Sequence, residues 1–210
     1  MSKVHLIAQN KQICYNLNNL RKDIVRLKCW SKVLVQNHAE GVLIRVLTIK
    51  IMRRLDRKTF DRRINAGVYW YKVKNPLRII ANGLILSFAK YFPSLPVKRG
   101  LLRLTGVRVG KNVSVAPSTI DPIFPELIDI GDNVMIGWDT MILTHEIIGS
   151  EFRKGRVKIG ENTTIGARSL ILAGVKIGKN AIIEADSLVN KDVKDNCIVG
   201  DVPIKQIKLK

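Results

Sequence analysis

His145 is the residue whose type and position best suggest chemistry. The chain has three histidines, and His145 is the only one after residue 106. It stands at the root of a charged segment, residues 146–158, that interrupts an otherwise regular stretch. An imidazole titrates near neutral pH, so it can take a proton from a hydroxyl or an amine as a general base. Glu146 and Asp121 are candidate carboxylates to orient the ring.

The stretch around His145 is a six-residue repeat that runs from Val109 to Pro203. An aliphatic residue returns at every sixth position, often followed by glycine, as in IGDNVM, IGENTT and IGKNAI. This period fits neither a helix nor an alternating strand, and it is typical of a β-helix solenoid. Each face of a three-sided coil turns one aliphatic side chain inward, and stacked coils share one core. The aliphatic positions are Val109, Val115, Ile130, Ile136, Ile142, Ile159, Ile165, Ile171, Ile177, Ile183 and Val189.

The repeat breaks twice. The first break is the proline-containing segment 118–129, and the second follows Ile142 and includes His145. Solenoids place such insertions as loops at the corners of the coil, where binding and catalytic residues often lie. We therefore expect the functional site at the breaks of the repeat.

Charge divides the chain into two parts. The net charge is +19; residues 1–106 carry 22 Lys/Arg and 4 Asp/Glu, whereas residues 107–210 carry 14 and 13. Because this change coincides with the start of the repeat, we expect a basic region over 1–106, a coil over 107–205 and a basic tail over 206–210.

The basic region is predicted to be helical and amphipathic. Apolar residues keep helical spacing with Lys and Arg between them. Asn75 and Pro76 provide a cap and a first-turn proline for the last helix, which Pro93 and Pro96 end. The predicted helices cover Leu17–Val35, Val42–Leu55 and Leu77–Phe92.

Two functions for these helices stay open. The apolar run Ile79–Ala89 has eleven residues, fewer than the roughly 20 that cross a bilayer. A basic amphipathic surface fits peripheral contact with an anionic membrane; alternatively, the apolar sides pack on each other, on the coil or on another subunit. No motif supports nucleic-acid binding. The first residues, MSKVHLIAQNKQ, lack the features of a signal peptide, so we expect a cytoplasmic protein, peripheral on the inner face of the membrane if the basic helices bind lipid.

Several other classes of site are excluded by residue type. Cys14, Cys29 and Cys197 are far apart and form no C-x-x-C pair. A zinc site built from three histidines would need more than one histidine in the coil, and residues 1–106 hold no Gly-rich phosphate loop. We predict no metal.

The segments IGDNVMIG, ILTHE, GRVKIGENTTIGARSLILAGVKIG and IIEADSLVNKDV resemble the hexapeptide-repeat acyltransferases. The likeness is greatest to the branch that contains maltose, galactoside and streptogramin O-acetyltransferases. It covers Val107 to Lys205, about half of the chain, and leaves the basic region outside. The resemblance implies a left-handed parallel β-helix that forms a homotrimer, with acetyl-CoA between neighbouring subunits.

The resemblance also implies roles for single residues. His145 matches the catalytic base, and a thioester donor then needs no Ser or Cys nucleophile. The backbone N–H of Ala167 matches the donor to the oxyanion. The positions that match cofactor contacts are Gly166, Ala167, Ala185, Lys191 and Lys205. The candidates to line the acceptor site are Asp121, Glu146 and Trp138, and Trp138 is also a candidate subunit contact.

The sequence therefore predicts an O-acetyltransferase that moves an acetyl group from acetyl-CoA to a hydroxyl of a sugar-like or cell-envelope acceptor. One alternative is N-acetyl transfer to an amino sugar by the same mechanism. A second alternative is a trimeric scaffold that docks on membranes without catalysis, in which His145 would be dispensable.

Overall fold

The computed structural model describes residues 4–8, 11–15, 34–38, 41–45, 53–60 and 70–209. The chain divides into two compact units, Met1–Ile51 and Met52–Lys210. The helices between residues 70 and 104 pack on the coil and belong to the second unit. The boundary at residue 106, which marks a change in charge and the start of the repeat, stays a prediction.

In the first unit the described residues form strands, which contradicts the predicted helices where the two overlap, at residues 34–35 and 42–45. β1 (Val4–Ala8) pairs with β2 (Lys11–Tyr15), and β3 (Leu34–His38) pairs with β4 (Gly41–Arg45), both antiparallel. The helix predicted over 42–55 is wrong where β4 stands, because the β-branched residues of VLI suit a paired strand as well as a helical stripe. Residues 16–33, most of the helix predicted over 17–35, lie outside the described residues.

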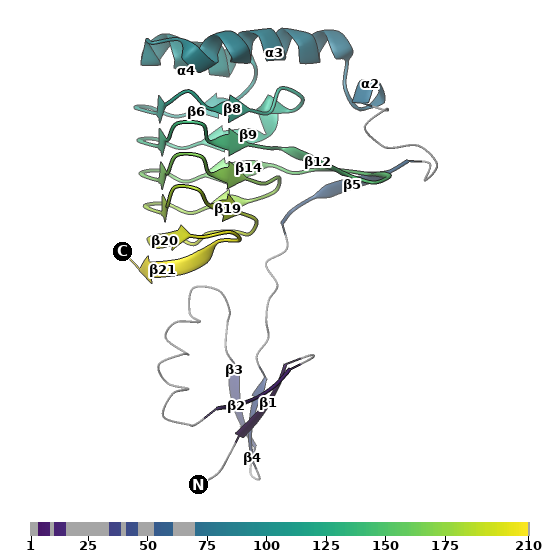
Figure 1. The fold of residues 1–210 in the computed structure, drawn as a ribbon, viewed down its shortest axis with the longest axis vertical. Coiled ribbons are helices and arrows are strands. Elements are labelled where there is room, and N and C mark those ends of the chain that lie inside the picture. Colours follow the sequence, from purple (N-terminus) through teal and green to yellow (C-terminus); the bar gives the residue numbers. More distant parts are fainter. Residues whose placement is uncertain are drawn as a thin grey trace. The chain divides into compact units, whose positions relative to one another are not determined.

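The second unit is a three-sided solenoid, as predicted, and each side is a sheet whose neighbouring coils pair in parallel (Figure 1). Each predicted aliphatic position is buried, from Val109 at 8% exposed to Ile142 and Ile183 at 0%. The first side holds β6 (Arg108–Val109), β9 (Ile128–Ile130), β14 (Val157–Ile159) and β17 (Lys176–Ile177). The second holds β7 (Ser114–Val115), β10 (Met135–Ile136), β15 (Thr164–Ile165), β18 (Ile182–Ile183), β20 (Cys197–Gly200) and the antiparallel β21 (Lys205–Leu209). The third holds β8 (Thr119–Ile120), β11 (Met141–Ile142), β16 (Leu170–Ile171) and β19 (Leu188–Val189).

Two residues have different functions at each corner: one permits close stacking, and the other adopts the left-handed backbone. Glycine after the aliphatic position is needed for close stacking: a Cβ on Gly166 would lie 2.4 Å from the backbone nitrogen of Ala185 in the next coil. The left-handed backbone is adopted two residues after the glycine, by Asn162 at one corner and by Arg168 at another. The asparagines at the first of these corners also bond from coil to coil, as between Asn133 and Asn162 at 3.1 Å.

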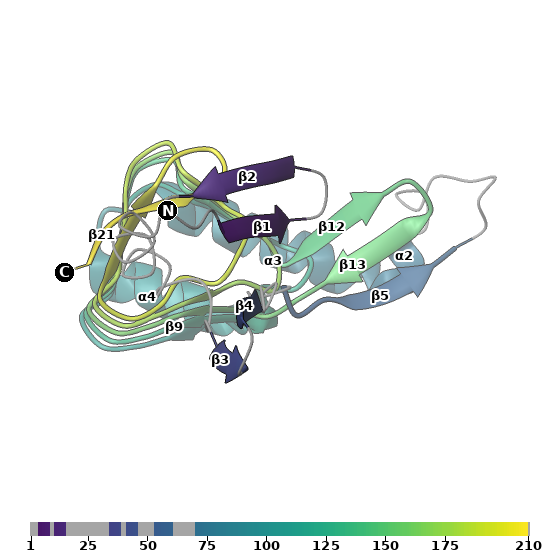
Figure 2. The same ribbon diagram turned by 90° about the horizontal axis from the view of Figure 1, so that it is seen from below.

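Two insertions leave the coil. The first contains the 3₁₀ turn η2 (Pro125–Leu127), and the second is a hairpin of β12 (His145–Ile148) and β13 (Glu151–Lys154). β5 (Asp56–Thr59) pairs antiparallel with β13 and adds a third strand. Viewed along the coil, these three strands project to one side of the triangular cross-section (Figure 2). The hairpin begins at His145, so the predicted site residue lies where the insertion leaves the coil.

Helices cover one end of the coil (Figure 1). After the short α2 (Trp70–Val73), α3 (Pro76–Tyr91) begins as predicted, with the side chain of Asn75 accepting a hydrogen bond from the Leu77 N–H at 2.9 Å. The sequence does not predict α4 (Leu95–Leu104), since it assigns Pro96 only to the end of α3; a proline is also favourable in the first turn of a helix, and Pro96 occupies that place in α4. None of the helices among residues 70–104 is long and apolar enough to cross a membrane.

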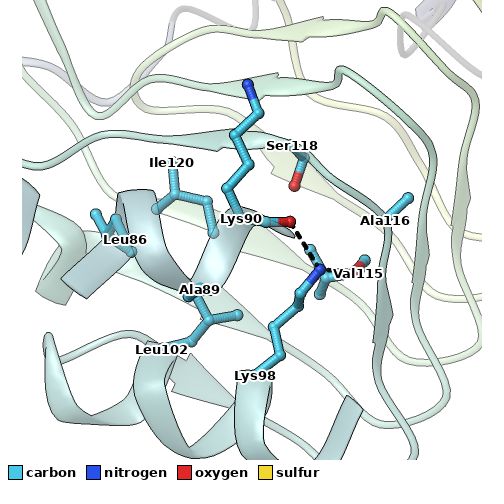
Figure 3. A pocket seen from close by; sticks show the side chains of 9 residues that line it. All are labelled: Leu86, Ala89, Lys90, Lys98, Leu102, Val115, Ala116, Ser118 and Ile120. Carbon is cyan, nitrogen blue, oxygen red and sulfur yellow. Dashed lines mark hydrogen bonds between the residues drawn. The ribbon is translucent and has the colours of Figure 1, made fainter. Parts of the chain in front are cut away.

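Cationic side chains of α4 fix this cap to the first coil. Lys98, only 4% exposed, donates hydrogen bonds of 3.0 Å to the carbonyl oxygens of Lys90 at the end of α3 and of Val115 in the coil (Figure 3). Arg103 donates to the carbonyl of Val109. The first coil has no preceding coil to pair with, so these donors satisfy its outward carbonyls. The inner side of the cap therefore follows the predicted alternative of packing on the coil.

Candidate active site

His145 and Asp121 form a close pair where the coil meets the hairpin. The Nδ1 atom of His145 lies 2.5 Å from Oδ2 of Asp121. Asp121 follows β8 and His145 follows β11 one coil later, and these strands pair with Ile120 opposite Ile142. The backbone N–H of Asp121 also donates to the Ile142 carbonyl at 3.1 Å. The regular ladder of the coil therefore fixes the carboxylate under the imidazole.

The carboxylate of Asp121 is fully buried and accepts several hydrogen bonds. Oδ2 accepts from the N–H of Thr144 at 2.9 Å and from its hydroxyl at 2.6 Å, and Oδ1 accepts from the N–H of Ile123 at 2.8 Å. Burial raises the pKa of the Asp121 carboxyl, but the hydrogen bond and charge of His145, with the hydrogen bonds from Thr144, outweigh it and hold the pKa below its ordinary value. The side chain is therefore an anion.

An anion beside Nδ1 determines the tautomer of His145. A carboxylate only accepts hydrogen bonds, so Nδ1 carries the proton and donates it to Asp121. The lone pair of the neutral ring is then on Nε2, on the side away from Asp121. The side chain of His145 is 19% exposed. The arrangement is that of an oriented general base whose protonated form would be stabilised by a buried negative charge.

Two phenylalanines from the two insertions enclose the imidazole. The ring of Phe152 in β13 stacks on His145 with centroids 5.7 Å apart and 14° between planes. Phe124, beside η2, meets His145 edge-on at 6.4 Å and Phe152 at 6.0 Å. Both phenylalanines are buried. The sequence prediction missed them, although each lies in a segment that breaks the repeat.

Glu146 is turned to a different partner. Its carboxylate forms a bidentate ion pair with Arg53, and Arg53 also donates to the carbonyl of Ala173. The side chains of Arg53 and Glu146 are 18% and 13% exposed. Glu146 thus anchors the segment before β5 to the base of the hairpin. Of the two predicted carboxylates, Asp121 orients the ring, and its complete burial leaves it no oxygen for a direct contact with an acceptor.

The predicted oxyanion donor lies at another corner of the coil. Trp138, Ala167 and Ala185 stack in successive coils: Arg168 N–H donates to the Trp138 carbonyl at 2.8 Å, and Asp186 N–H donates to the Ala167 carbonyl at 2.9 Å. Within the described residues the N–H of Ala167 donates no hydrogen bond, so it is available to a ligand. Trp138 is 59% exposed.

One protomer does not bring His145 and Ala167 together. β11 pairs with β16 with Ile142 opposite Ile171, so Ala167 is level with Trp138, seven residues before His145. Between these two levels the chain passes the corner at Asp139, where φ is 55°, and then runs along β11. The base and the oxyanion donor therefore lie at opposite ends of one side of the coil.

The two predicted lysines differ in their surroundings. Lys191 follows β19 on the third side of the coil. It lies at the same end of that side as His145, two coils further along. It is half-buried, and burial lowers the pKa of its ammonium group. Lys205 is exposed, and its Nζ lies 2.7 Å from Oδ2 of Asp201. Among the described residues, no cluster of three His, Cys, Asp or Glu side chains is placed to hold a metal ion.

Comparison with known proteins gives consistent matches. The family described as "Bacterial transferase hexapeptide (six repeats)" matches residues 156–191. The Bacillus subtilis (strain 168) protein named "Putative acetyltransferase YvoF" is 39% identical over 163 residues, which cover 76% of this chain and 93% of that protein. This similarity extends well beyond the matched repeats.

Solved structures share the fold. A maltose O-acetyltransferase from Clostridium difficile 630 superposes with a TM-score of 0.54 at 22% identity, covering 70% of this chain and 97% of that one. A galactoside acetyltransferase in complex with coenzyme A gives a TM-score of 0.52 at 23% identity, covering 64% of this chain and 81% of that one. The solenoid is thus the left-handed parallel β-helix that the family resemblance implied.

Proposed function

Because this chain belongs to the hexapeptide-repeat acetyltransferases, we propose that it transfers the acetyl group of acetyl-CoA to a hydroxyl of a sugar-like or cell-envelope acceptor. His145 is the general base of this proposal. The observation that carries it is the contact between His145 and the buried Asp121, which in the neutral ring places the lone pair on Nε2. The galactoside acetyltransferase with the same fold binds coenzyme A, which supports acetyl-CoA as the donor.

The proposed reaction needs one proton shuttle. Nε2 of His145 removes the proton of the acceptor hydroxyl while the hydroxyl oxygen attacks the thioester carbonyl carbon. The carbonyl oxygen becomes an oxyanion, which the N–H of Ala167 meets. The C–S bond then breaks, and the imidazolium returns the proton to the thiolate of coenzyme A. Asp121 stabilises the imidazolium between these steps and does not itself change protonation.

We propose a homotrimer as the active form. His145 and Ala167 lie at different corners of one protomer, with β11 between their levels, so we expect a second subunit to supply Ala167 to the same thioester. The exposed Trp138, Met135 and Met141, at 59%, 55% and 40%, give the same part of the coil an apolar surface for a neighbouring subunit. This supports Trp138 as a subunit contact rather than as part of the acceptor site.

Coenzyme A is then expected along the corner column of Gly166, Ala167 and Ala185, with Lys191 and Lys205 as candidates for its phosphates. The absence of a Cβ on Gly166 permits the tight stacking that aligns Ala167 and Ala185. Lys205 would have to leave Asp201 to bind a phosphate. Because both side chains are largely exposed, breaking their ion pair costs little free energy.

The protein's place of action is proposed from charge. Residues 70–106 hold seven Lys/Arg and no Asp or Glu. A surface of this sign is attracted to the anionic inner leaflet, and a cell-envelope acceptor attached to lipid would be found there. We therefore propose a cytoplasmic enzyme that contacts the inner face of the membrane peripherally.

A thiol-release assay tests the proposed reaction. Acetyl-CoA is incubated with the protein and with sugars, amino sugars or lipid-linked glycans, and free coenzyme A is measured. We expect release that depends on a hydroxyl acceptor; a preference for amino sugars would instead establish N-acetyl transfer. His145→Ala should lower turnover by about 10²–10⁴-fold with coenzyme A binding and oligomeric mass unchanged.

His38→Ala is the matched control, because it removes another histidine from the first unit of the chain. It should retain the wild-type rate. If His145→Ala were as active as His38→Ala, or if no acyl-CoA bound, the catalytic proposal would be wrong and the scaffold alternative would stand.

A further inference from the structure

We propose that the outward face of α3 is a docking surface for an anionic lipid bilayer. This inference specifies the membrane contact of the proposed function, but it depends neither on acetyl transfer nor on His145. The surface consists of Leu77, Ile80, Leu84, Phe88 and Tyr91, which we call the α3 stripe.

The α3 stripe is apolar, continuous and exposed. Its residues recur at intervals of three and four, so they share one face of the helix. The exposed fractions are 76% for Leu77, 55% for Ile80, 68% for Leu84, 61% for Phe88 and 69% for Tyr91. Five large side chains in a row exceed the scattered apolar residues of an ordinary surface, and such patches mark interaction sites.

The face of α3 that packs on the coil is opposite to the α3 stripe, so the apolar residues of the stripe are not needed for packing on the coil. The residues that α3 buries against the coil are Asn82, Leu86 and Ala89. Asn82 is polar and donates a hydrogen bond of 3.1 Å to the carbonyl of Pro122. The helix thus presents more apolar side chains to its surroundings than to its own core. A helix that served only to cap the coil would have the reverse distribution.

The positive charge beside the α3 stripe favours an anionic bilayer over a second copy of the chain as its partner. Arg78 and Lys90 lie on the two sides of the α3 stripe in the helix, and residues 70–106 contain no Asp or Glu. Of the seven Lys/Arg in this segment, Lys98 is buried and Lys74 is paired with Glu126, and the other five remain to give this end a positive charge. A second copy of the chain docked stripe to stripe would bring two such cationic surfaces together, which opposes association. An anionic bilayer offers both a complementary charge and an apolar layer for the stripe.

The orientation of α3 also fits a membrane surface. The helix lies flat across the end of the coil, with α4 beside it (Figure 1). Its 16 residues extend about 24 Å. With its outward face against the bilayer, the whole length of α3 would lie in the plane of the membrane interface. In a trimer with coils side by side, three stripes would face the same way, and their binding would be multivalent.

Vesicle flotation of the full-length protein tests the surface without any substrate. Vesicles of phosphatidylcholine with about 30% phosphatidylglycerol are compared with phosphatidylcholine alone, in low and high salt. The test variant is Leu84→Gln/Phe88→Gln. The matched control is Ile148→Gln/Ile207→Gln, which removes two apolar side chains of similar exposure, 54% and 55%, from the hairpin tip and from β21 at the other end of the coil. Circular dichroism and thermal melting check that each variant is folded.

We expect the wild type and the control to float with the anionic vesicles, with less binding as salt rises. The test variant should bind at least about 10-fold more weakly, because two inserted side chains are lost. Wild-type flotation by the folded test variant would overturn the proposal and assign any lipid binding to other basic residues. Absence of wild-type flotation would also overturn it. A fall in oligomeric mass of the test variant, with flotation unchanged, would instead make the stripe a contact between copies.

Discussion

Replacing Asp121 with asparagine keeps the shape of the side chain and removes the charge that faces His145. In the wild type, Oδ2 of Asp121 accepts from Nδ1 of His145 and from two donors of Thr144, while Oδ1 accepts from the Ile123 N–H. An amide offers only one oxygen. In either orientation of Asn, one buried N–H loses its acceptor, the Ile123 N–H in one case and the Thr144 N–H in the other.

The two orientations have different effects on the base. When the amide oxygen faces His145, the tautomer is kept, but a charged hydrogen bond of about 1.5–3 kcal/mol becomes a neutral one of about 0.5–1.5 kcal/mol. This alone reduces the rate roughly tenfold. When the NH₂ group faces His145, it donates to Nδ1, the ring proton moves to Nε2, and the base cannot work. Because each orientation leaves one N–H unpaired, both are populated to a comparable extent, and we expect kcat to fall roughly 20-fold.

Steady-state thiol release with saturating acceptor measures this effect. Asp121 is buried and touches no ligand surface, so the KM for acetyl-CoA should stay within about twofold while kcat falls. Thr144→Val is the graded control: it removes one hydroxyl donor at 2.6 Å and keeps the backbone donor at 2.9 Å, so it should cost about 2- to 10-fold. A kcat for Asp121→Asn within about threefold of wild type would refute the assignment of the base, and so would equal changes in kcat and KM.

Three further predictions concern the surroundings of the site. Gly174→Ala should destabilise the fold by about 1–3 kcal/mol in thermal melting, because φ is +78° and the new Cβ would lie 2.7 Å from the Arg54 carbonyl oxygen; Gly149→Ala, with φ +59° and open space, should cost less. The folded-state pKa of Asp121 is lowered, so its stabilisation is complete above about pH 4 and is lost as pH falls through that lowered pKa. Acid denaturation should therefore separate wild type from Asp121→Asn above about pH 4 and bring them together below it. Phe152→Leu, which removes the ring stacked on the imidazole, should lower kcat about 3- to 10-fold with the fold retained.

The coil was predictable because its repeat is local. Each aliphatic position recurs without reference to distant sequence, and one inward side chain per face is enough to specify the core. The exception is the side that carries the site. Counting six from Val115 gives Asp121, but the aliphatic residue of the core is Ile120, because this face is one residue shorter. Recognising Ile120 as the partner of Ile142 would have placed Asp121 beneath His145 from the sequence alone.

The walls of the site were not predictable in the same way. Phe124 and Phe152 lie in the two insertions, 21 and 7 residues from His145, and no period relates them to the coil. Their approach depends on η2 and on the pairing of β12 with β13, which are set by tertiary contacts. Arg53 is more distant still, and its ion pair with Glu146 follows from β5 joining the hairpin.

The basic region shows the limit of periodicity as a guide. Short segments rich in Val, Leu and Ile satisfy a helical stripe and a strand equally well, and only pairing partners decide between them. Residues 41–45 form β4 because 34–38 lie opposite. The helix α3, by contrast, has the local signals of Asn75 as cap and Pro76 in the first turn, and its start agrees with the prediction.

The position of His145 at a break in the repeat has a physical cause. Within the regular coil the inward strand positions are aliphatic, the other buried positions hold small side chains such as Thr163 and Ser169, and the corners are fixed by the stacking of the next coil, as at Gly166. A regular coil therefore offers a base no enclosed position. The insertion supplies that position, but a free loop would not hold a ring within hydrogen-bond distance of one oxygen. Asp121 meets both requirements, because its backbone belongs to the ladder of the coil and its carboxylate accepts a hydrogen bond from the ring of His145, the first residue of the hairpin. In the proposed mechanism the rigid coil sets the position of the base, and the hairpin and β5 would determine which acceptor reaches Nε2.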